Sequence, residues 1–336
     1  MIAEALKILE RGSSLSEETM IQSMKAVMSG QVSEENIISF LTLLRDKGEV
    51  LSEVLGAARV MREFSVKVAV NQENLVDTCG TGGDAQGTFN ISTAAAFVVA
   101  GAGVRVAKHG NRAVSSQSGS ANVLEALGVK IDLEPIQVRQ CLQKAGMGFF
   151  FGPRFHPAMK NVAAARKKIG TRTIINLLGP LTNPTNPLFQ VLGVYDPQKM
   201  ILMAQVLKEL GSRRVFFVHG VDGLDEITLT GKTKMVELNE GKITEWELDP
   251  KNFGFEYCSL KDLKGRDAVN NATFLKGVLE GYVSPLRDAV ILNAAAAVKV
   301  SGRAQEWNEA IEVAVHSLDQ GKAYQVLKDL VRVSNE

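Results

Sequence analysis

Apolar residues in the first 64 positions recur every three or four residues, which is the spacing of amphipathic helices. Ser16, Ser33 and Ser52 each precede such a stretch, and serine is a preferred residue at a helix N-cap. Gly30 and Gly48 follow the first two stretches and are expected to end them. The pattern predicts consecutive helices, an arrangement more typical of a packing or dimerisation module than of a catalytic site.

The spacing changes near residue 75, where short apolar runs alternate with glycine-containing loops and apolar helices. A strand, a glycine loop and a helix follow one another twice, which is typical of parallel βα units. The expected elements of the two units are a strand at 75–79, a loop at 80–84, a helix from about 90 to 101, a strand at 104–107, a loop at 108–112 and a helix at 121–127. Further along the chain we expect strands at 190–194 and 215–218, a smaller β-rich patch at 226–248, and helices at 273–279, 289–300 and 304–333.

Residues 156–180 interrupt this alternation with apolar positions at helical spacing. We expect this segment to return to the N-terminal helices, which makes their domain discontinuous. The predicted fold class is α/β, with a small all-helical domain from residues 1–70 plus about 155–182. A larger α/β domain, from 71–154 plus 183–336, is expected to hold a mainly parallel central sheet.

The composition is that of a globular protein that can bury a full core. Of 336 residues, 45% are hydrophobic and 22% charged, which excludes a disordered chain, a collagen-like chain and a disulfide scaffold. The formal net charge of +1 gives no overall basic footprint, so nucleic acid is not an expected partner. Three cysteines cannot all pair and match no zinc motif, so reduced thiols and a cytoplasmic location are expected. No apolar run is long enough to cross a bilayer and the first residues do not resemble a signal peptide, so no membrane association is expected.

The loop at residues 80–84 reads Gly-Thr-Gly-Gly-Asp. Glycines let a backbone approach a ligand closely and present N–H groups to an anion. Ser92 and Thr93 at the start of the next helix add hydroxyl donors, and a helix N-terminus favours negative charge. Two adjacent βα units form a crevice for phosphate at the carboxyl ends of their strands. A glycine-rich turn without a ligand is an equally good interpretation of this loop on its own.

Two familiar phosphate fingerprints fit poorly. The first loop matches the G-x-G-x-x-A pattern of dinucleotide-binding proteins, but these place an acid at the end of the next strand, where this chain has Lys108 and His109. The P-loop pattern G-x-x-x-x-G-K-[ST] does not occur in the sequence. A dinucleotide-dependent oxidoreductase and a P-loop nucleotidase are therefore disfavoured.

The loop at residues 108–112 places a lysine, a histidine and an arginine around one glycine, and four serines follow between positions 115 and 120. Cations and small hydroxyl groups suit a further phosphate, although each serine also suits a helix N-cap. Asp225 and Glu226 follow a predicted strand and suit Mg²⁺, which proteins hold with one or two carboxylates plus substrate phosphates. An isolated Asp-Glu pair is usually a solvated turn, but the two loops upstream favour the metal site.

Together these motifs resemble the anthranilate phosphoribosyltransferase family of tryptophan biosynthesis, whose members are glycosyltransferases that transfer a pentosyl group. The resemblance implies a fold shared with nucleoside phosphorylases, a homodimer joined through the helical domain, and two Mg²⁺ ions. The implied reaction transfers 5-phosphoribosyl from phosphoribosyl pyrophosphate (PRPP) to the amine of anthranilate and releases pyrophosphate. The matching segments stand in the family's order and spacing at 80–84, 90–93, 108–112, 118–121, 172–184 (RTIINLLGPLTNP) and 223–226, with weaker similarity at 44–49 and 293–297.

Site residues carry over where the motifs match. The resemblance implies that no side chain acts as a nucleophile, so that catalysis is electrostatic and positional. It implies Mg²⁺ ligands at Ser92, Asp225 and Glu226. PRPP ligands are implied at Gly80, Gly82, Gly83, Asp84, Thr88, Asn90, Ser92, Thr93, Lys108, Asn111 and Ser120. Anthranilate contacts are implied at Gly80, His109, Asn111, His156 and Arg166, with Arg166 pairing the substrate carboxylate.

Two positions depart from the family pattern, which usually has Asp at Asn122 and often has Phe at Ile175. Asn122 is nearly isosteric with Asp but uncharged, which puts a local cap or hydrogen bond at issue. The nearest alternative function is a nucleoside phosphorylase, but that family's Lys-His-Ser-Thr-Gly-Gly signature is absent from the sequence. A non-catalytic relative that binds nucleic acid is disfavoured by the retained glycine loop and Asp-Glu pair.

The neutral total charge hides an uneven distribution. Residues 85–195 hold twelve Lys and Arg residues against three acidic residues, a local net charge of +9, so the rest of the chain carries −8. A basic central segment between acidic flanking segments suits two anionic substrates.

Overall fold

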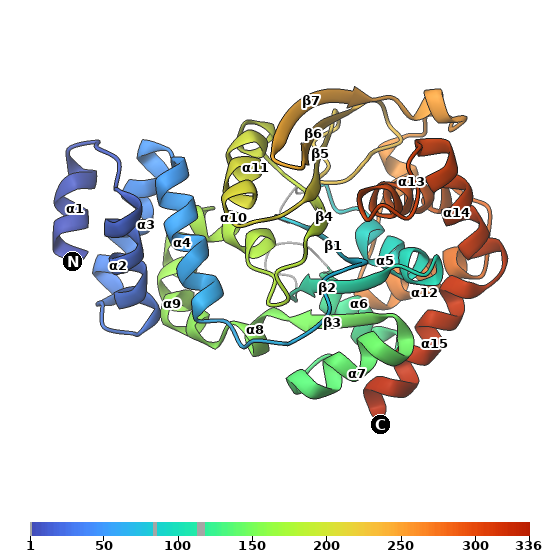
Figure 1. Ribbon diagram of the computed structural model, residues 1–336, viewed down its shortest axis with the longest axis horizontal. Helices are drawn as coiled ribbons and strands as arrows, with labels where there is room; N and C mark the ends of the chain where they lie inside the picture. The colour runs from blue at the N-terminus through green and yellow to red at the C-terminus, as the bar shows by residue number, and fades with distance from the viewer. Residues whose placement is uncertain (1, 83–85, 113–117) are drawn as a thin grey trace.

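The N-terminal domain begins with four helices that pack beside one another (Figure 1). The computed structural model describes residues 2–82, 86–112 and 118–336. The Ser16 and Ser33 side chains each accept a hydrogen bond from the backbone N–H three residues later, so both predicted N-caps are confirmed. The four helices are α1 (Ile2–Glu10), α2 (Glu17–Met28), α3 (Glu34–Lys47) and α4 (Leu51–Glu63).

The cap predicted at Ser52 is wrong, because Val50 occupies the N-cap position and the buried Glu53 side chain binds the backbone there. Glu53 Oε2 accepts a hydrogen bond from the Val50 N–H at 3.0 Å, and Oε1 accepts one from the Leu15 N–H at 2.9 Å. Lys47 Nζ donates to Glu53 Oε2 at 3.0 Å and balances its charge. The Ser52 hydroxyl donates to Leu15 O instead. Glu53 thus joins the start of α4 to the loop between α1 and α2.

In the described residues, seven strands form one sheet in the order β3-β2-β1-β4-β5-β6-β7. Strands β1 to β5 run parallel to one another, which confirms the predicted βα units and the mainly parallel sheet. Strands β6 and β7 extend one edge in antiparallel fashion. The strands are β1 (Leu75–Gly80), β2 (Arg105–Gly110), β3 (Met147–Phe151), β4 (Phe189–Gly193), β5 (Arg214–Gly220), β6 (Thr233–Asn239) and β7 (Lys242–Leu248).

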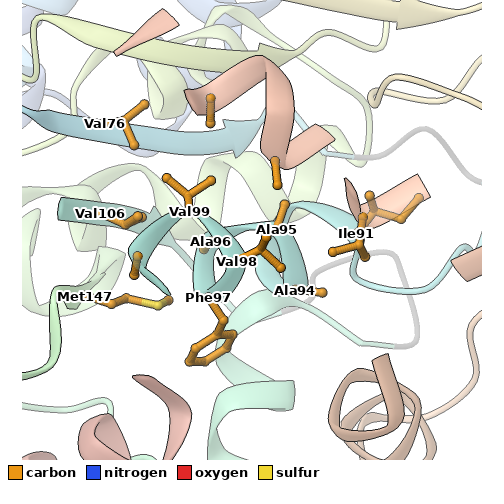
Figure 2. Close-up of a cluster of buried hydrophobic side chains, with 14 of the residues drawn as sticks. Val76, Ile91, Ala94, Ala95, Ala96, Phe97, Val98, Val99, Val106 and Met147 are labelled. Atoms are coloured by element: carbon orange, nitrogen blue, oxygen red, sulfur yellow. The ribbon is translucent and has the colours of Figure 1, made fainter. Parts of the chain in front are cut away.

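Helix α5 packs on one face of the sheet and is itself covered by the C-terminal helices (Figure 1). Figure 2 shows its apolar side chains beside Val76, Val106 and Met147 of β1, β2 and β3. Because α5 is buried between these layers, its first turn is held at a fixed place near the carboxyl ends of the parallel strands. The helices in and around this layer are α5 (Ile91–Gly101), α6 (Ser120–Ala126), α7 (Pro135–Ala145), α12 (Ala268–Leu279), α13 (Pro285–Val300), α14 (Trp307–Asp319) and α15 (Lys322–Asn335).

The opposite face of the sheet packs against α11 and the helical domain. One cluster of buried apolar residues extends from the N-terminal helices through α9, α10 and α11 to β4, β5 and β6. Helix α9 contacts α2 and α3, and α10 contacts α4, so the segment expected to return to the N-terminal helices lies against them. The remaining elements are α8 (Gly152–Phe155), α9 (Lys160–Ile169), α10 (Ile174–Leu181), α11 (Met200–Glu209) and the 3₁₀ helices η1 (Pro157–Met159), η2 (Pro197–Lys199), η3 (Pro250–Phe253) and η4 (Leu260–Leu263).

Two general expectations concern membranes and cysteines. Across the described part of the chain, no helix has both the length and the apolar character that a membrane span requires. Cys79 and Cys141 are buried, Cys258 is half-buried, and all three are free thiols. The expectation that the cysteines remain reduced stays a prediction.

Candidate active site

The loop after β1 meets the loop after β5 at the carboxyl ends of the parallel strands. The Gly82 N–H donates a hydrogen bond to Asp225 Oδ2 at 2.9 Å. Gly82 has a φ of 64°, a backbone conformation that glycine adopts without strain. The two predicted ligands that follow it, Gly83 and Asp84, lie outside the described residues. The predicted phosphate loop and the predicted metal pair are therefore neighbours in space.

Two glycines allow Asp225 to pack closely against the carboxyl ends of β1 and β4. A Cβ atom on Gly193 would overlap the Asp225 carbonyl oxygen, and one on Gly80 would lie 2.6 Å from Asp225 Oδ2, whereas real Cβ atoms essentially never come within 3.0 Å. The Thr81 N–H donates to Gly193 O at 2.9 Å, which ties the glycine loop to the same strand. Asp225 is thus held against β1 and β4 by close contacts that only glycine permits.

Glu226 reaches the start of α5. Its Oε1 accepts a hydrogen bond from the Ser92 N–H at 3.0 Å. The buried Lys108 ammonium lies 3.5 Å from Ser92 Oγ and donates to Thr78 O. Burial, and then the Asp225 charge, raises the pKa of Glu226 to about 8, while burial lowers the pKa of Lys108 against the opposing effect of nearby carboxylates. The structure therefore gathers the predicted metal ligands and the predicted phosphate lysine into one cluster.

The oxygen donors of this cluster fit a hard divalent cation. Asp225 and Glu226 supply carboxylates and Ser92 supplies a hydroxyl group, and Mg²⁺ prefers oxygen ligands. Within the residues that the structure describes, no group of three or more His, Cys, Asp or Glu side chains could hold a metal. A cation at this place would therefore share its remaining positions between water and the oxygens of a substrate. Its charge would relieve the repulsion between the two half-buried carboxylates.

Asn90 joins the two predicted phosphate loops at the N-cap position of α5. Its Nδ2 donates to Ser118 O at 3.1 Å, and its Oδ1 accepts a hydrogen bond from Asn271 Nδ2 at 2.9 Å. Thr93 is buried in the first turn of the same helix. Thr88 lies earlier in the loop and forms a β-bridge with Lys264 of the segment after η4. Asn90 is fixed by the surrounding chain and is well placed to hold the two loops together.

Ser120 and Asn111 stand at the end of the second βα loop. Ser120 is the first residue of α6, and its hydroxyl group occupies the space where Gly110 would carry a Cβ atom. Asn111 Oδ1 accepts a hydrogen bond from the Arg112 N–H at 2.8 Å. Both residues follow the carboxyl end of β2, the strand that carries Lys108.

Two imidazole rings, those of His109 and His156, lie beside each other near the carboxyl end of β2. The ring centroids of His109 and His156 are 5.1 Å apart, and His109 Nδ1 lies 3.1 Å from Gly179 O of α10. Burial lowers the pKa of His109 to about 3 and that of His156 to about 4. The backbone of Thr182 approaches the His156 ring, but neither nitrogen of that ring has a hydrogen-bond partner among the described residues. Both rings are neutral near pH 7, and the His156 nitrogens are available to a polar ligand.

Arg166 lies on α9 of the helical domain. It is half-buried, and this burial alone lowers the pKa of its guanidinium group. Among the described residues it takes part in no ion pair. A partly buried guanidinium group without an acidic partner is suited to a carboxylate ligand.

Two buried polar residues support the site and were not predicted. Asp77 in β1 accepts hydrogen bonds from Asn183 Nδ2 at 2.9 Å, from Cys79 Sγ at 3.2 Å and from the His109 N–H at 3.2 Å. Burial raises the pKa of Asp77, and the Asn183 hydrogen bond opposes that shift. Asn183 Nδ2 also donates to Ala107 O at 2.8 Å, so this pair fixes the end of β2. The signal in the sequence is an acidic residue inside an apolar strand.

The two departures from the family pattern are accommodated locally. Asn122 Oδ1 accepts a hydrogen bond from the Gly119 N–H at 3.1 Å at the start of α6, so the cap needs an oxygen acceptor rather than a charge. Ile175 is buried in the apolar cluster shared with the N-terminal helices. The structure thus retains the cap at position 122 and an apolar contact at position 175.

Comparison with known proteins covers both parts of the chain. Residues 3–65 match the glycosyl transferase family, helical bundle domain, and residues 72–324 match the glycosyl transferase family, a/b domain. An anthranilate phosphoribosyltransferase from Acetivibrio thermocellus is 48% identical over 335 residues, which cover 100% of this chain and 97% of that relative.

Solved structures agree in fold over the whole length. Anthranilate phosphoribosyltransferase from Thermus thermophilus matches with a TM-score of 0.93 at 40% identity, covering 99% of each chain. The enzyme from Saccharomyces cerevisiae, in complex with PRPP and Mg, matches with a TM-score of 0.91 at 29% identity, covering 99% of this chain and 98% of that one. The chain belongs to the glycosyl transferase family and, within it, to the anthranilate phosphoribosyltransferases.

Proposed function

We propose that the protein transfers the 5-phosphoribosyl group of PRPP to the amine of anthranilate and releases pyrophosphate, a step of tryptophan biosynthesis. The observation that carries the proposal is a junction of three segments. Hydrogen bonds from Gly82 to Asp225 and from Ser92 to Glu226 join the glycine loop, the start of α5 and the loop after β5. This junction offers a lysine, hydroxyl groups and carboxylates to a pyrophosphate with its cation. Membership of the family supports the specific pair of substrates.

PRPP is assigned to the loops at the carboxyl ends of β1 and β2. Mg²⁺ is assigned as the cofactor, because the donor atoms are oxygens and the Saccharomyces cerevisiae relative binds PRPP and Mg. Two ions are proposed, one at Ser92 and one at Asp225 with Glu226. Bound Mg²⁺ neutralises the charge of the departing pyrophosphate. The proposed PRPP ligands are Gly80, Gly82, Gly83, Asp84, Thr88, Asn90, Ser92, Thr93, Lys108, Asn111 and Ser120.

Anthranilate is assigned to the side of the histidine pair. Neutral imidazole rings offer hydrogen bonds without adding charge, and Arg166 pairs with the substrate carboxylate. Closure of the helical domain over the α/β domain would bring anthranilate toward PRPP and exclude water. The proposed anthranilate contacts are Gly80, His109, Asn111, His156 and Arg166.

The reaction needs no protein nucleophile. As the bond between C1 of the ribose and pyrophosphate breaks, positive charge develops on the sugar and negative charge on the leaving group. The Lys108 ammonium and the first turn of α5 stabilise the leaving group through fixed charge and dipoles. The neutral aromatic amine of anthranilate attacks C1 and then loses a proton to solvent. The main contribution of the protein is to hold the two substrates in line.

We also propose the domain division and the assembly state. Residues 1–70 and about 155–182 would form one helical domain, supported by the contacts of α9 with α2 and α3, and 71–154 with 183–336 would form the PRPP-binding domain. The helical domain would join two copies into a homodimer. Sedimentation of the protein at the mass of one 36.3 kDa chain would contradict the dimer. Free thiols and a biosynthetic reaction support a cytoplasmic location.

The loss of anthranilate fluorescence after addition of PRPP and Mg²⁺ tests the proposed function. We expect consumption of anthranilate only when all three components are present, and none after removal of Mg²⁺ with EDTA. Asp225→Asn combined with Glu226→Gln should lower turnover by about 100-fold or more, because charge stabilisation of the leaving group is lost. Full turnover by this double variant would refute the metal assignment. Phosphate-dependent release of a base from a nucleoside, without reaction of anthranilate, would favour a nucleoside phosphorylase.

A further inference from the structure

We propose that Asn293, a buried residue of α13, is a positioning residue that holds Asp225 and Glu226 in the geometry required for Mg²⁺. The inference deepens the proposed function and depends on it in one respect, since it takes these two carboxylates as the metal ligands. Asn293 acts through Ile227, the residue that follows Glu226 in the chain.

One side-chain amide holds both polar groups of the Ile227 backbone. Asn293 Oδ1 accepts a hydrogen bond from the Ile227 N–H at 3.0 Å, and Asn293 Nδ2 donates to Ile227 O at 2.8 Å. Nδ2 also donates to Ala289 O, one turn earlier in α13, at 2.9 Å, which fixes the orientation of the amide. Ile227 is 0% exposed and Asn293 is 3% exposed, so water does not replace these bonds. The buried helix α13 therefore serves as the fixed support of the loop.

The other end of the loop is held by Asp222. Its Oδ2 accepts hydrogen bonds from the hydroxyl groups of Thr228 and Thr230 at 2.6 and 2.7 Å, and its Oδ1 accepts one from the Leu224 N–H at 3.1 Å. The two carboxylates lie between this turn and Ile227. Glu226 and Ile227 are joined by one peptide group. The N–H of this group donates to Asn293 Oδ1. Loss of the amide frees this peptide group and with it the direction of the Glu226 side chain.

A purely structural role for Asn293 has a different consequence from a positioning role. If the amide only satisfies a buried backbone, its removal lowers stability, and metal binding by the folded protein stays the same. If it positions the carboxylates, metal binding weakens by more than the loss of stability explains. Partners that orient metal ligands typically change metal affinity or activity by about 10–100-fold.

The experiment titrates Mn²⁺ alone into the full-length protein and follows the electron paramagnetic resonance signal of the free ion. Asn293→Leu removes all three side-chain hydrogen bonds and keeps the branched shape of the side chain, and Asn293→Ala removes them with less bulk. Ile291→Ala is the matched control, because two residues correspond to roughly 200° around the helix and place position 291 on the opposite side of α13. We expect the Kd for Mn²⁺ to rise about 10–100-fold in both Asn293 variants. In Ile291→Ala we expect wild-type Mn²⁺ affinity despite a lower Tm.

Two further readouts separate the roles. Hydrogen exchange in residues 220–228 should become faster in the Asn293 variants and remain at the wild-type rate in Ile291→Ala. In steady-state kinetics, the Mg²⁺ concentration that gives half-maximal rate and the KM for PRPP should both rise, while the KM for anthranilate stays constant.

The outcome is decided by metal affinity in folded protein. Wild-type Mn²⁺ affinity in Asn293→Ala, or an equal loss of affinity in Ile291→Ala, overturns the proposal. If Asn293→Leu does not fold, Asn293→Ala decides between the two roles. Absence of anthranilate turnover by the wild-type protein would reject the proposed reaction and leave the Mn²⁺ comparison valid, so the two failures are distinguishable.

Discussion

Replacing Gly193 with alanine tests how closely Asp225 must approach β4. The new methyl group would occupy the space of the Asp225 carbonyl oxygen, well within the 3.0 Å limit of real Cβ contacts. The carbonyl group must retreat by roughly 1 Å, and a misplacement of that size in an active site costs about 100-fold in rate. This corresponds to about 2.7 kcal/mol of transition-state stabilisation. The carboxylate that accepts the Gly82 hydrogen bond at 2.9 Å would move with its backbone.

The assay is the initial rate of anthranilate fluorescence loss at several Mg²⁺ concentrations, together with the Tm of each variant. The control is Gly101→Ala at the far end of α5, where a Cβ would lie 2.7 Å from the Ala323 backbone nitrogen and would overlap the Ser317 hydroxyl group. Both variants should lose thermal stability, but only Gly193→Ala should lose about 100-fold in kcat/KM. Wild-type kcat/KM in Gly193→Ala, or an equal loss in Gly101→Ala, would refute the reasoning.

Three other changes have defined outcomes. Arg166→Ala should raise the KM for anthranilate by about 10–100-fold, the worth of a charge-assisted hydrogen bond, and leave the KM for PRPP nearly constant in steady-state kinetics; the reverse pattern would reject its assigned role. Because burial lowers the pKa of His156 from 6.5 to about 4, the unfolded chain binds a proton in that pH window that the folded protein does not. Stability should therefore fall as the pH drops through this window, by up to about 1.4 kcal/mol per pH unit for this residue. His156→Gln should flatten the slope in urea unfolding, and an unchanged slope would contradict the assignment. Glu53→Ala removes the acidic partner of Lys47 and the acceptor of two backbone N–H groups, so urea unfolding should show a loss of about 3–5 kcal/mol with kcat unaffected; a loss below about 1 kcal/mol would mean that the buried pair adds little.

Local features of the fold were predictable from the sequence because they depend on neighbouring residues. The Ser16 and Ser33 caps and the two βα units follow from residues within one turn or one loop. The Ser52 cap was wrong because Glu53 binds Leu15, 38 residues away, and this contact outweighs the local preference. Strand β3 was missed, since its continuous run of phenylalanines lacks the alternation that marks a half-exposed strand, as is typical of strands buried on both faces.

The supporting contacts of the site could not be predicted, because each joins segments that are distant in the chain. Asp77 and Asn183 are 106 residues apart, and Ile227 and Asn293 are 66 apart. No spacing rule in a single sequence relates such pairs. The motifs indicated which residues we propose to contact the substrates, whereas the residues that hold those groups in place became visible only in three dimensions.

The strand order also determines when the site can form during synthesis. β1 pairs with β2 on one side and with β4 on the other, and β4 leaves the ribosome more than a hundred residues after β1. The site needs every segment from Gly80 to Asn293, an interval of about 10–40 s at ordinary translation rates of about 5–20 residues per second. Until β4 arrives, one edge of β1 exposes unpaired backbone groups that can recruit a wrong strand. A nascent chain released before α13 carries both phosphate loops but has no support for the carboxylates, so activity should appear only with the nearly complete polypeptide.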